Sequence, residues 1–182
     1  MHQSVIDFLR QEIKGSEILS KTVLEVGSYN VNGTPREVIG SLGASCYVGV
    51  DSQPGPCVDR VVSANELIKT FGEESFDVVI STEMLEHVRD WRMVVTQMKG
   101  VTKVGGLLVI TTRSPGFPYH AYPEDHWRFT ISDFQSIFQD MAIMTLKPDA
   151  PGFPGVLLKA RRKACALLTI EELSTVTPAG PH

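Results

Sequence analysis

The sequence predicts an α/β protein built on a mostly parallel β-sheet. Five short apolar runs alternate with segments that have the spacing of helices. Two of the runs, residues 76–81 and 107–112, are apolar almost throughout, as strands buried on both faces of a parallel sheet are. Turn-forming and helix-ending residues separate the runs, so the alternation indicates strand–helix–strand units.

The elements follow in a regular order. Strands are expected over residues 22–26, 46–51, 61–62, 76–81 and 107–112. One helix is expected to begin near residue 5 and to end at Gly15, and a second is expected to begin after an N-cap at Thr34. Further helices are expected over residues 66–71, 90–100 and 132–140. Two late strands, 141–146 and 155–159, would close the sheet as a hairpin. Right-handed crossovers place helices on both faces, which gives a doubly wound, seven-stranded sheet with a late antiparallel strand.

The length of 182 residues suits one domain with a sizeable core. We expect that domain over residues 1–163, with an N-terminal helix in residues 1–15. An extension over residues 164–182 follows, and its end is expected to be frayed.

The composition narrows the choice of partners. A net charge of −4 gives no electrostatic reason to expect nucleic acid or an anionic membrane. No apolar run approaches the roughly 20 residues of a membrane span. The three cysteines are widely spaced and odd in number, and the N-terminus is too polar for a signal peptide. These features favour a cytoplasmic location.

The most informative stretch is residues 22–33, a strand that runs into a small polar loop. The next strand ends in Asp51, and a strand, loop, helix and acid-tipped strand form the layout of a nucleoside-binding unit. Tyr29 and Asn32 stand where the second and third glycines of Gly-x-Gly-x-x-Gly would fall, which disfavours a pyrophosphate. A ligand with ribose and adenine but no phosphate fits better. An ordinary strand-to-helix turn with an exposed Asp51 is the alternative.

Four segments resemble successive motifs of class I S-adenosylmethionine-dependent methyltransferases: residues 23–27, 48–51, 76–87 and 105–110. Residues 119–130 are similar to a loop of a small, type 11-like branch whose members often accompany polysaccharide or secondary-metabolite pathways. The resemblance implies a Rossmann-like fold, S-adenosylmethionine as cofactor, and in-line methyl transfer to a small-molecule or saccharide acceptor.

The resemblance also implies which residues hold the cofactor. They are Glu25, Gly27, Ser28, Tyr29, Asp51, Ser63, Ala64, Thr82 and Glu83. Asp51 falls on the acid that binds the ribose. The chain departs from the family pattern at Tyr29 and Val31, which replace two glycines, and at Ser63, where many relatives have Asp.

Two groups of residues are candidates for the acceptor side. The first is Glu83, Glu86 and His87, just after the strand at 76–81. His87 is a candidate general base, because imidazole is the side chain best suited to that work near neutral pH, although it could instead tie a loop to the sheet.

The second group lies in a long loop over residues 113–129. It comprises His120, Tyr122, Asp125, His126, Trp127 and Arg128. His126 is the second candidate base, and Trp127 could simply anchor the loop. A metal held by His87, His120, Asp125 and His126 is chemically feasible, but no short ligand spacing supports it, so no metal is predicted.

Two other functions remain open from the sequence. One is a non-catalytic module that binds S-adenosylmethionine or activates a partner. The other is a NAD-dependent or nucleotide-sugar enzyme on a similar fold, against which the missing glycines argue. The sequence does not decide whether O, N or C is methylated, and it is compatible with a homodimer.

Overall fold

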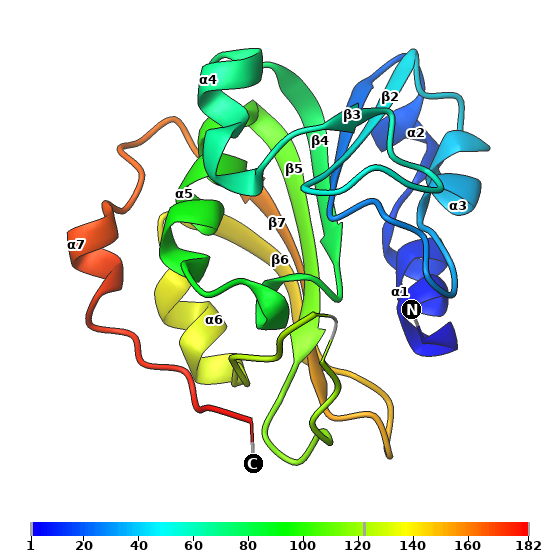
Figure 1. Ribbon diagram of the computed structural model, residues 1–182. Helices are drawn as coiled ribbons and strands as arrows, with labels where there is room; N and C mark the ends of the chain where they lie inside the picture. The colour runs from blue at the N-terminus through cyan, green and yellow to red at the C-terminus, as the bar shows by residue number, and fades with distance from the viewer. Residues whose placement is uncertain (1, 122, 182) are drawn as a thin grey trace.

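The computed structural model describes residues 2–121 and 123–181. Seven strands form a single sheet in the order β3-β2-β1-β4-β5-β7-β6 (Figure 1). Their bounds are β1 (Thr22–Val26), β2 (Cys46–Asp51), β3 (Arg60–Val61), β4 (Phe76–Thr82), β5 (Thr102–Arg113), β6 (Met141–Pro148) and β7 (Gly155–Arg162). The pairs from β3 to β5 are parallel, and β7 runs antiparallel to both of its neighbours. The predicted fold class is therefore confirmed, including the late antiparallel strand.

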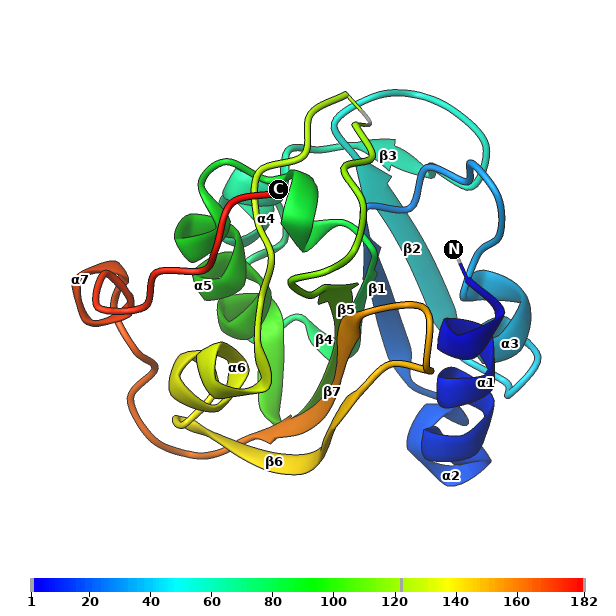
Figure 2. The same ribbon diagram turned by 90° about the horizontal axis from the view of Figure 1, so that it is seen from below.

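Helices cover both faces of the sheet (Figures 1 and 2). One layer holds α1 (Gln3–Glu12), α2 (Gly15–Ile18) and α3 (Arg36–Gly40). The other holds α4 (Leu67–Phe71), α5 (Trp91–Val101), α6 (Ile131–Ile137) and α7 (Ile170–Leu173), with the 3-10 turns η1 (Ala64–Glu66) and η2 (Leu85–His87). Among the described residues, no helix has the length and apolar character needed to cross a membrane.

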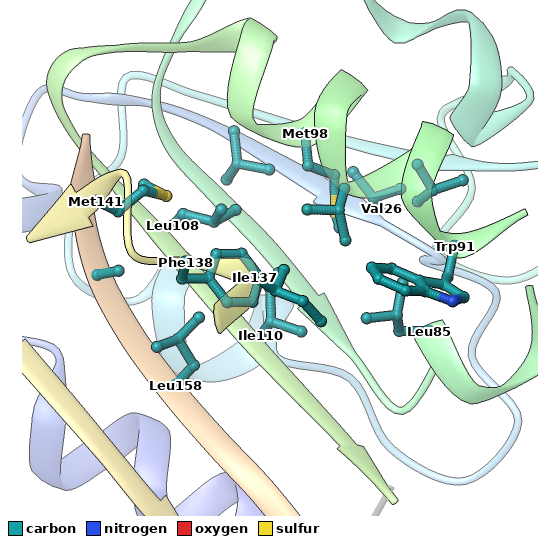
Figure 3. Close-up of a cluster of buried hydrophobic side chains, with 14 of the residues drawn as sticks. Val26, Leu85, Trp91, Met98, Leu108, Ile110, Ile137, Phe138, Met141 and Leu158 are labelled. Atoms are coloured by element: carbon teal, nitrogen blue, oxygen red, sulfur yellow. The ribbon is translucent and has the colours of Figure 1, made fainter. Parts of the chain in front are cut away.

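Each face of the sheet has its own apolar core. The larger cluster packs helices α5 and α6 on the sheet, and Figure 3 shows it around Trp91, Leu108 and Leu158. The smaller cluster joins α1 to the opposite face through Phe8 and Leu9. Burial on both faces explains why the central strands are apolar at nearly every position.

The order of the strands places a crevice beside β1. From β1 the chain builds outward through β2 and β3, and it then returns to add β4 on the other side. The connections leaving β1 and β4 therefore diverge to opposite sides, and open α/β sheets bind ligands outside the carboxyl ends of strands at such a point.

Some element ends differ from those expected. Helix α1 stops at Glu12, and Gly15 begins α2, where the Glu17 carboxylate accepts a hydrogen bond from Lys14 N at 2.9 Å. Helix α3 begins at Arg36, whose amide donates to Thr34 Oγ1 at 3.1 Å.

Strand β5 is longer than its apolar run predicts. Its pairing with β4 jumps from Phe76 opposite Thr102 to Val78 opposite Leu107. Gly105 has a φ of 78°, so it permits the bulge that absorbs the extra residues. Gly105 and Gly106 come before the apolar run over residues 107–112 that predicted the strand, but both lie within β5.

The C-terminal extension packs on the domain as far as residue 179. Leu173 is fully buried, and Arg92 donates to the carbonyls of Leu173 and Val176 at 3.1 and 2.6 Å. Ala179 and Arg128 exchange backbone hydrogen bonds of 3.1 and 2.7 Å. The apolar residues of this segment are too scattered in the sequence to indicate these backbone contacts.

Candidate functional site

A cavity of about 520 Å³ opens at the carboxyl ends of β1, β2 and β4. Its volume lies in the range of small-molecule sites. The lining includes all nine residues predicted to hold the cofactor: Glu25, Gly27, Ser28, Tyr29, Asp51, Ser63, Ala64, Thr82 and Glu83. His87 also lines it, whereas His126 is not among the lining residues.

The turn after β1 is formed by Gly27. Its amide and that of Ser28 donate to Val50 O at 2.9 and 3.0 Å, which ties the turn to β2. Gly27 has a φ of 81°, and a Cβ there would lie 2.6 Å from Met84 Cγ. Only glycine fits both the left-handed backbone and the close approach of η2.

Asp51 stands at the end of β2 and faces the same turn. Its Oδ2 accepts the amide of Tyr29 at 3.2 Å, and its Oδ1 accepts that of Gln53 at 3.2 Å. The carboxylate is thereby oriented at the cavity wall with acceptor capacity left over. This placement suits an acid that accepts hydrogen bonds from two neighbouring ribose hydroxyls.

The bulky loop after Gly27 packs sideways onto the loop after β2. A Cβ on Gly55 would lie 2.1 Å from Tyr29 Cε2, so the Tyr29 ring rests directly on that glycine. Asn30 N donates to Pro56 O at 2.9 Å, and Gly33 N donates to Asn30 Oδ1 at 2.8 Å. The absence of a side chain at Gly55 thus makes room for the Tyr29 ring. A loop with glycine in place of Tyr29 would not need this room.

Ser63 and Ala64 lie where β3 leads into η1. Ser63 Oγ accepts the amide of Asn65 at 3.3 Å and caps the turn. Val62 N donates to Asp51 O at 2.9 Å, which keeps this segment beside β2. The serine is therefore already used as a cap, although its hydroxyl proton can still be donated.

Glu25 lies on β1 and is 2 % exposed. Burial is the main cause that raises its pKa to about 7, and the hydrogen bond from Tyr47 Oη, 2.8 Å long, partly opposes the shift. Near neutral pH this carboxyl is therefore divided between its two protonation states.

Glu83 follows β4 with a φ of 55°. Its amide donates to Thr111 O at 3.0 Å, and its Oε1 accepts from Thr111 Oγ1 at 2.9 Å. Its Oε2 pairs with the buried guanidinium of Arg113, which also binds Asp149 at 3.0 Å. Glu83 is thus fixed by β5 at the cavity wall, and its charge is balanced.

Glu86, His87 and His120 come together where η2 meets the 113–129 loop. The Glu86 side chain is fully buried, and its Oε2 accepts from Thr112 Oγ1 at 2.8 Å. Its Oε1 lies 3.9 Å from His87 Nε2 and 3.8 Å from His120 Nε2. The approach to Glu86 is the largest cause that raises the pKa of His120, and burial opposes it.

A buried ion pair organises the 113–129 loop. Arg128 is 1 % exposed and donates to both oxygens of Asp125 at 2.5 and 2.6 Å. It also binds the carbonyls of Phe117 and Pro118 at 3.2 and 3.1 Å. Asp125 accepts the amide of His120 at 2.9 Å, so the pair sets the position of that histidine.

His126 and Trp127 hold the loop against η2. Their amides donate to Glu86 O at 2.9 and 3.2 Å, and the Trp127 indole donates to Val88 O at 2.9 Å. His126 Nε2 lies 2.9 Å from Glu124 Oε2, so its ring contacts the loop itself. Trp127 is thus an anchor, and Tyr122 lies outside the described residues.

The cavity lining extends beyond the residues predicted to hold the cofactor. It includes Met84, His120, which was predicted for the acceptor side, and His2 from the N-terminus. His2 was not predicted, because only the path of the chain brings it to the cavity. The described lining residues contain no Lys or Arg, so the cavity offers carboxylates but none of the permanently cationic side chains that usually balance a pyrophosphate.

The comparisons with known proteins agree with this geometry. A sequence model of the family described as "Methyltransferase domain" matches residues 31–110. Ubiquinone biosynthesis O-methyltransferases of Rhizobium etli (strain CFN 42) and Rhizobium rhizogenes (strain K84) are 32 % identical over 99 and 100 residues. Each match covers 54 % of this chain and 38 % of the relative, so the matched region spans less than half the length of these proteins.

Solved structures share the fold at low sequence identity. A Burkholderia thailandensis 1,6-didemethyltoxoflavin-N1-methyltransferase, with that compound and S-adenosylhomocysteine bound, has a TM-score of 0.70 at 14 % identity, over 88 % of this chain and 77 % of its own. A chain in the complex of the Haloferax volcanii Trm112 methyltransferase activator with a methyltransferase has a TM-score of 0.70 at 13 % identity, over 92 % of both chains.

The family match and the shared fold agree with the class I S-adenosylmethionine-dependent methyltransferases that the sequence motifs resemble. The cofactor of that class is S-adenosylmethionine, and the cavity has the carboxylates and the lack of Lys and Arg side chains that suit a positively charged nucleoside. The family match and the relatives named above are methyltransferases, which speaks against a NAD-dependent enzyme.

Proposed function

We propose that this chain transfers the methyl group of S-adenosylmethionine to a hydroxyl group of a small-molecule acceptor. The observation that carries the proposal is the cavity beside β1, where the predicted cofactor residues and His87 line one space. The names of the relatives, which are O-methyltransferases, support oxygen as the acceptor atom. A saccharide or another secondary metabolite remains within this class.

Different residues would hold different parts of the cofactor. Asp51 would hold the ribose, Ser63 and Ala64 would lie beside the adenine, and the turn at Gly27 would approach the methionine part. When bound, S-adenosylmethionine would supply an activated methyl carbon for in-line displacement by the acceptor oxygen, with the sulfur as leaving group. Because the sulfur becomes neutral, catalysis depends chiefly on alignment of the reacting atoms.

A hydroxyl acceptor must also lose its proton. Of the two predicted bases, His87 lines the cavity and His126 is not among the lining residues. His87 Nδ1 lies 2.6 Å from Glu124 O, and a carbonyl only accepts, so Nδ1 carries a proton and the lone pair of the neutral imidazole is on Nε2. We therefore take His87 as the first candidate base and His126 as the second.

Calorimetry with S-adenosylhomocysteine and with NAD tests the cofactor. We expect saturable binding of S-adenosylhomocysteine and none of NAD, and tight binding of NAD alone would refute the proposal.

Incubation with S-adenosylmethionine and a panel of phenols, catechols and saccharides then tests the activity by the S-adenosylhomocysteine formed. Cofactor binding without turnover across the panel would favour the non-catalytic or partner-activating module. Size-exclusion chromatography decides between a monomer and a homodimer, which the sequence leaves open, and nucleic-acid titration checks the predicted lack of a nucleic-acid partner.

A further inference from the structure

We propose that Glu86, His87 and His120 form a binding site for one divalent transition-metal ion of the zinc or ferrous class in the wall of the cavity. The three side chains each offer a ligand atom, and these atoms all lie within 4.8 Å of one another. No metal-ligand motif links these residues in the sequence, because only the fold of the 113–129 loop brings His120 to Glu86 and His87.

The Glu86 carboxyl has one hydrogen-bonded oxygen and one oxygen without a partner among the described residues, as a metal ligand without its ion would. The side chain is fully buried, and Thr112 Oγ1 satisfies Oε2 at 2.8 Å. The other oxygen, Oε1, has no hydrogen-bond partner among the described residues. A buried acceptor left unsatisfied costs stability, so such an atom calls for an explanation. Oε1 faces the Nε2 atoms of His87 and His120 at 3.9 and 3.8 Å, which is too long for hydrogen bonds.

Both imidazoles turn Nε2 toward Glu86, and in the neutral form with the proton on Nδ1 each Nε2 offers its lone pair there. The Glu124 carbonyl, 2.6 Å away, requires a proton on His87 Nδ1. His120 Nδ1 lies 3.1 Å from Asp125 Oδ2, which favours a proton on that nitrogen too, although the two atoms are not aligned as a hydrogen bond. Metal-binding histidines commonly turn their second nitrogen to a carbonyl or a carboxylate in this way.

The ligand set identifies the class of metal. Two imidazoles and one carboxylate hold zinc in hydrolytic enzymes and ferrous iron in oxygenases, while magnesium and calcium prefer oxygen ligands. Ligands about 2.0–2.1 Å from a tetrahedral ion stand about 3.3 Å apart, so binding would draw the Nε2 and Oε1 atoms together by roughly half an ångström.

Both histidines line the cavity, so the remaining coordination positions would open toward the acceptor. This part of the inference rests on the proposed function. An ion there would bind the acceptor oxygen, lower the pKa of its hydroxyl and release the proton to solvent. His87 would then act as a ligand in place of its role as base.

Metal binding is tested on protein stripped with a chelator, without any acceptor. Calorimetry with zinc chloride alone, and with ferrous salt under anaerobic conditions, should give one ion per chain. Cobalt substitution should give the visible absorption of a low-coordinate site. We expect Glu86→Gln and His120→Ala each to weaken zinc binding at least tenfold. His126→Ala is the matched control in the same loop and should leave zinc affinity within about twofold.

Circular dichroism and thermal melts establish that each variant is folded. If Glu86→Gln is unfolded, His120→Ala and His120→Gln carry the test, since His120 is half-buried. Failure of the stripped protein to bind one ion, or binding that Glu86→Gln and His120→Ala leave unchanged, overturns the inference. S-adenosylhomocysteine binding is measured on the same metal-free protein. Its presence without metal binding refutes only the metal site, and its absence refutes the proposed function.

Discussion

The amide of Tyr29 donates to Asp51 Oδ2 at 3.2 Å, and this bond joins the turn after β1 to the end of β2. It orients the carboxylate proposed to hold the ribose. The Tyr29 ring packs on Gly55, and this contact holds the backbone amide that binds Asp51. The residue that replaces a family glycine therefore also positions the acid.

Asp51→Asn keeps the size of that side chain and removes its charge. We expect the affinity for S-adenosylhomocysteine to fall by about 1.5–3 kcal/mol, the value of charge-assisted hydrogen bonds, which is roughly 10- to 150-fold. Calorimetry measures it, and Glu73→Gln, at an exposed position, serves as the control. Unchanged affinity would place the ribose elsewhere.

Gly27→Ala tests the turn after β1 in two steps. The left-handed backbone costs an alanine about 1–2 kcal/mol, and the contact with Met84 Cγ adds to that cost. The variant should therefore lose stability in urea and lose affinity for S-adenosylhomocysteine. Adding Met84→Ala should restore only the part due to crowding. Full recovery in the double variant would show that the backbone conformation contributes little.

The Arg128–Asp125 pair should be the main support of the 113–129 loop. Asp125→Asn leaves a buried guanidinium without its charge partner, and breaking a buried pair from one side costs about 3–5 kcal/mol. Limited proteolysis should then cut this loop much faster. Arg89→Ala removes an exposed pair with Glu124 and should change stability by less than about 1 kcal/mol. Equal effects of the two variants would contradict this assignment.

Substitutions of the two candidate bases, His87 and His126, should lower kcat to different extents. His87→Ala should lower kcat by about 100-fold or more while S-adenosylhomocysteine affinity stays within about threefold, since a positioned base contributes about 10²–10⁴. His126→Ala should lower kcat less, because its ring contacts Glu124 in the loop. A larger loss for His126→Ala would make His126 the base. Both are measured once an acceptor is found.

Local patterns predicted most of the fold but only half of the site. The strands at residues 22–26 and 46–51 were predicted to the residue, because continuous apolar runs leave few other places for them. Motif positions such as Asp51 follow from strand ends, which a parallel sheet gathers at one edge. The meeting of Glu86 with His120 depends on the path of a long loop held by Arg128, and no periodicity encodes that path. The packing of residue 179 on Arg128 was hidden for the same reason.

The buried carboxyl of Glu25 should give the fold a pH dependence of its own. Its pKa is raised from 4.5 to about 7 by burial, so the folded state binds the proton more tightly than the unfolded state does. The stability it contributes is therefore fully present below about pH 4.5 and is lost as the pH rises through about 7. The loss is on the order of 3–4 kcal/mol at most, from about 1.36 kcal/mol for each pKa unit.

Glu25→Gln removes this titration while it keeps the size of the side chain and an acceptor for Tyr47. Urea unfolding of the cofactor-free protein between pH 5 and 8 should show wild-type stability falling relative to that of Glu25→Gln. Asp77 and Asp125 have pKa values lowered to about 2, so their contributions change only at lower pH and cancel in the comparison. Parallel pH profiles for the two proteins would mean that Glu25 is ionised throughout this range in the folded state.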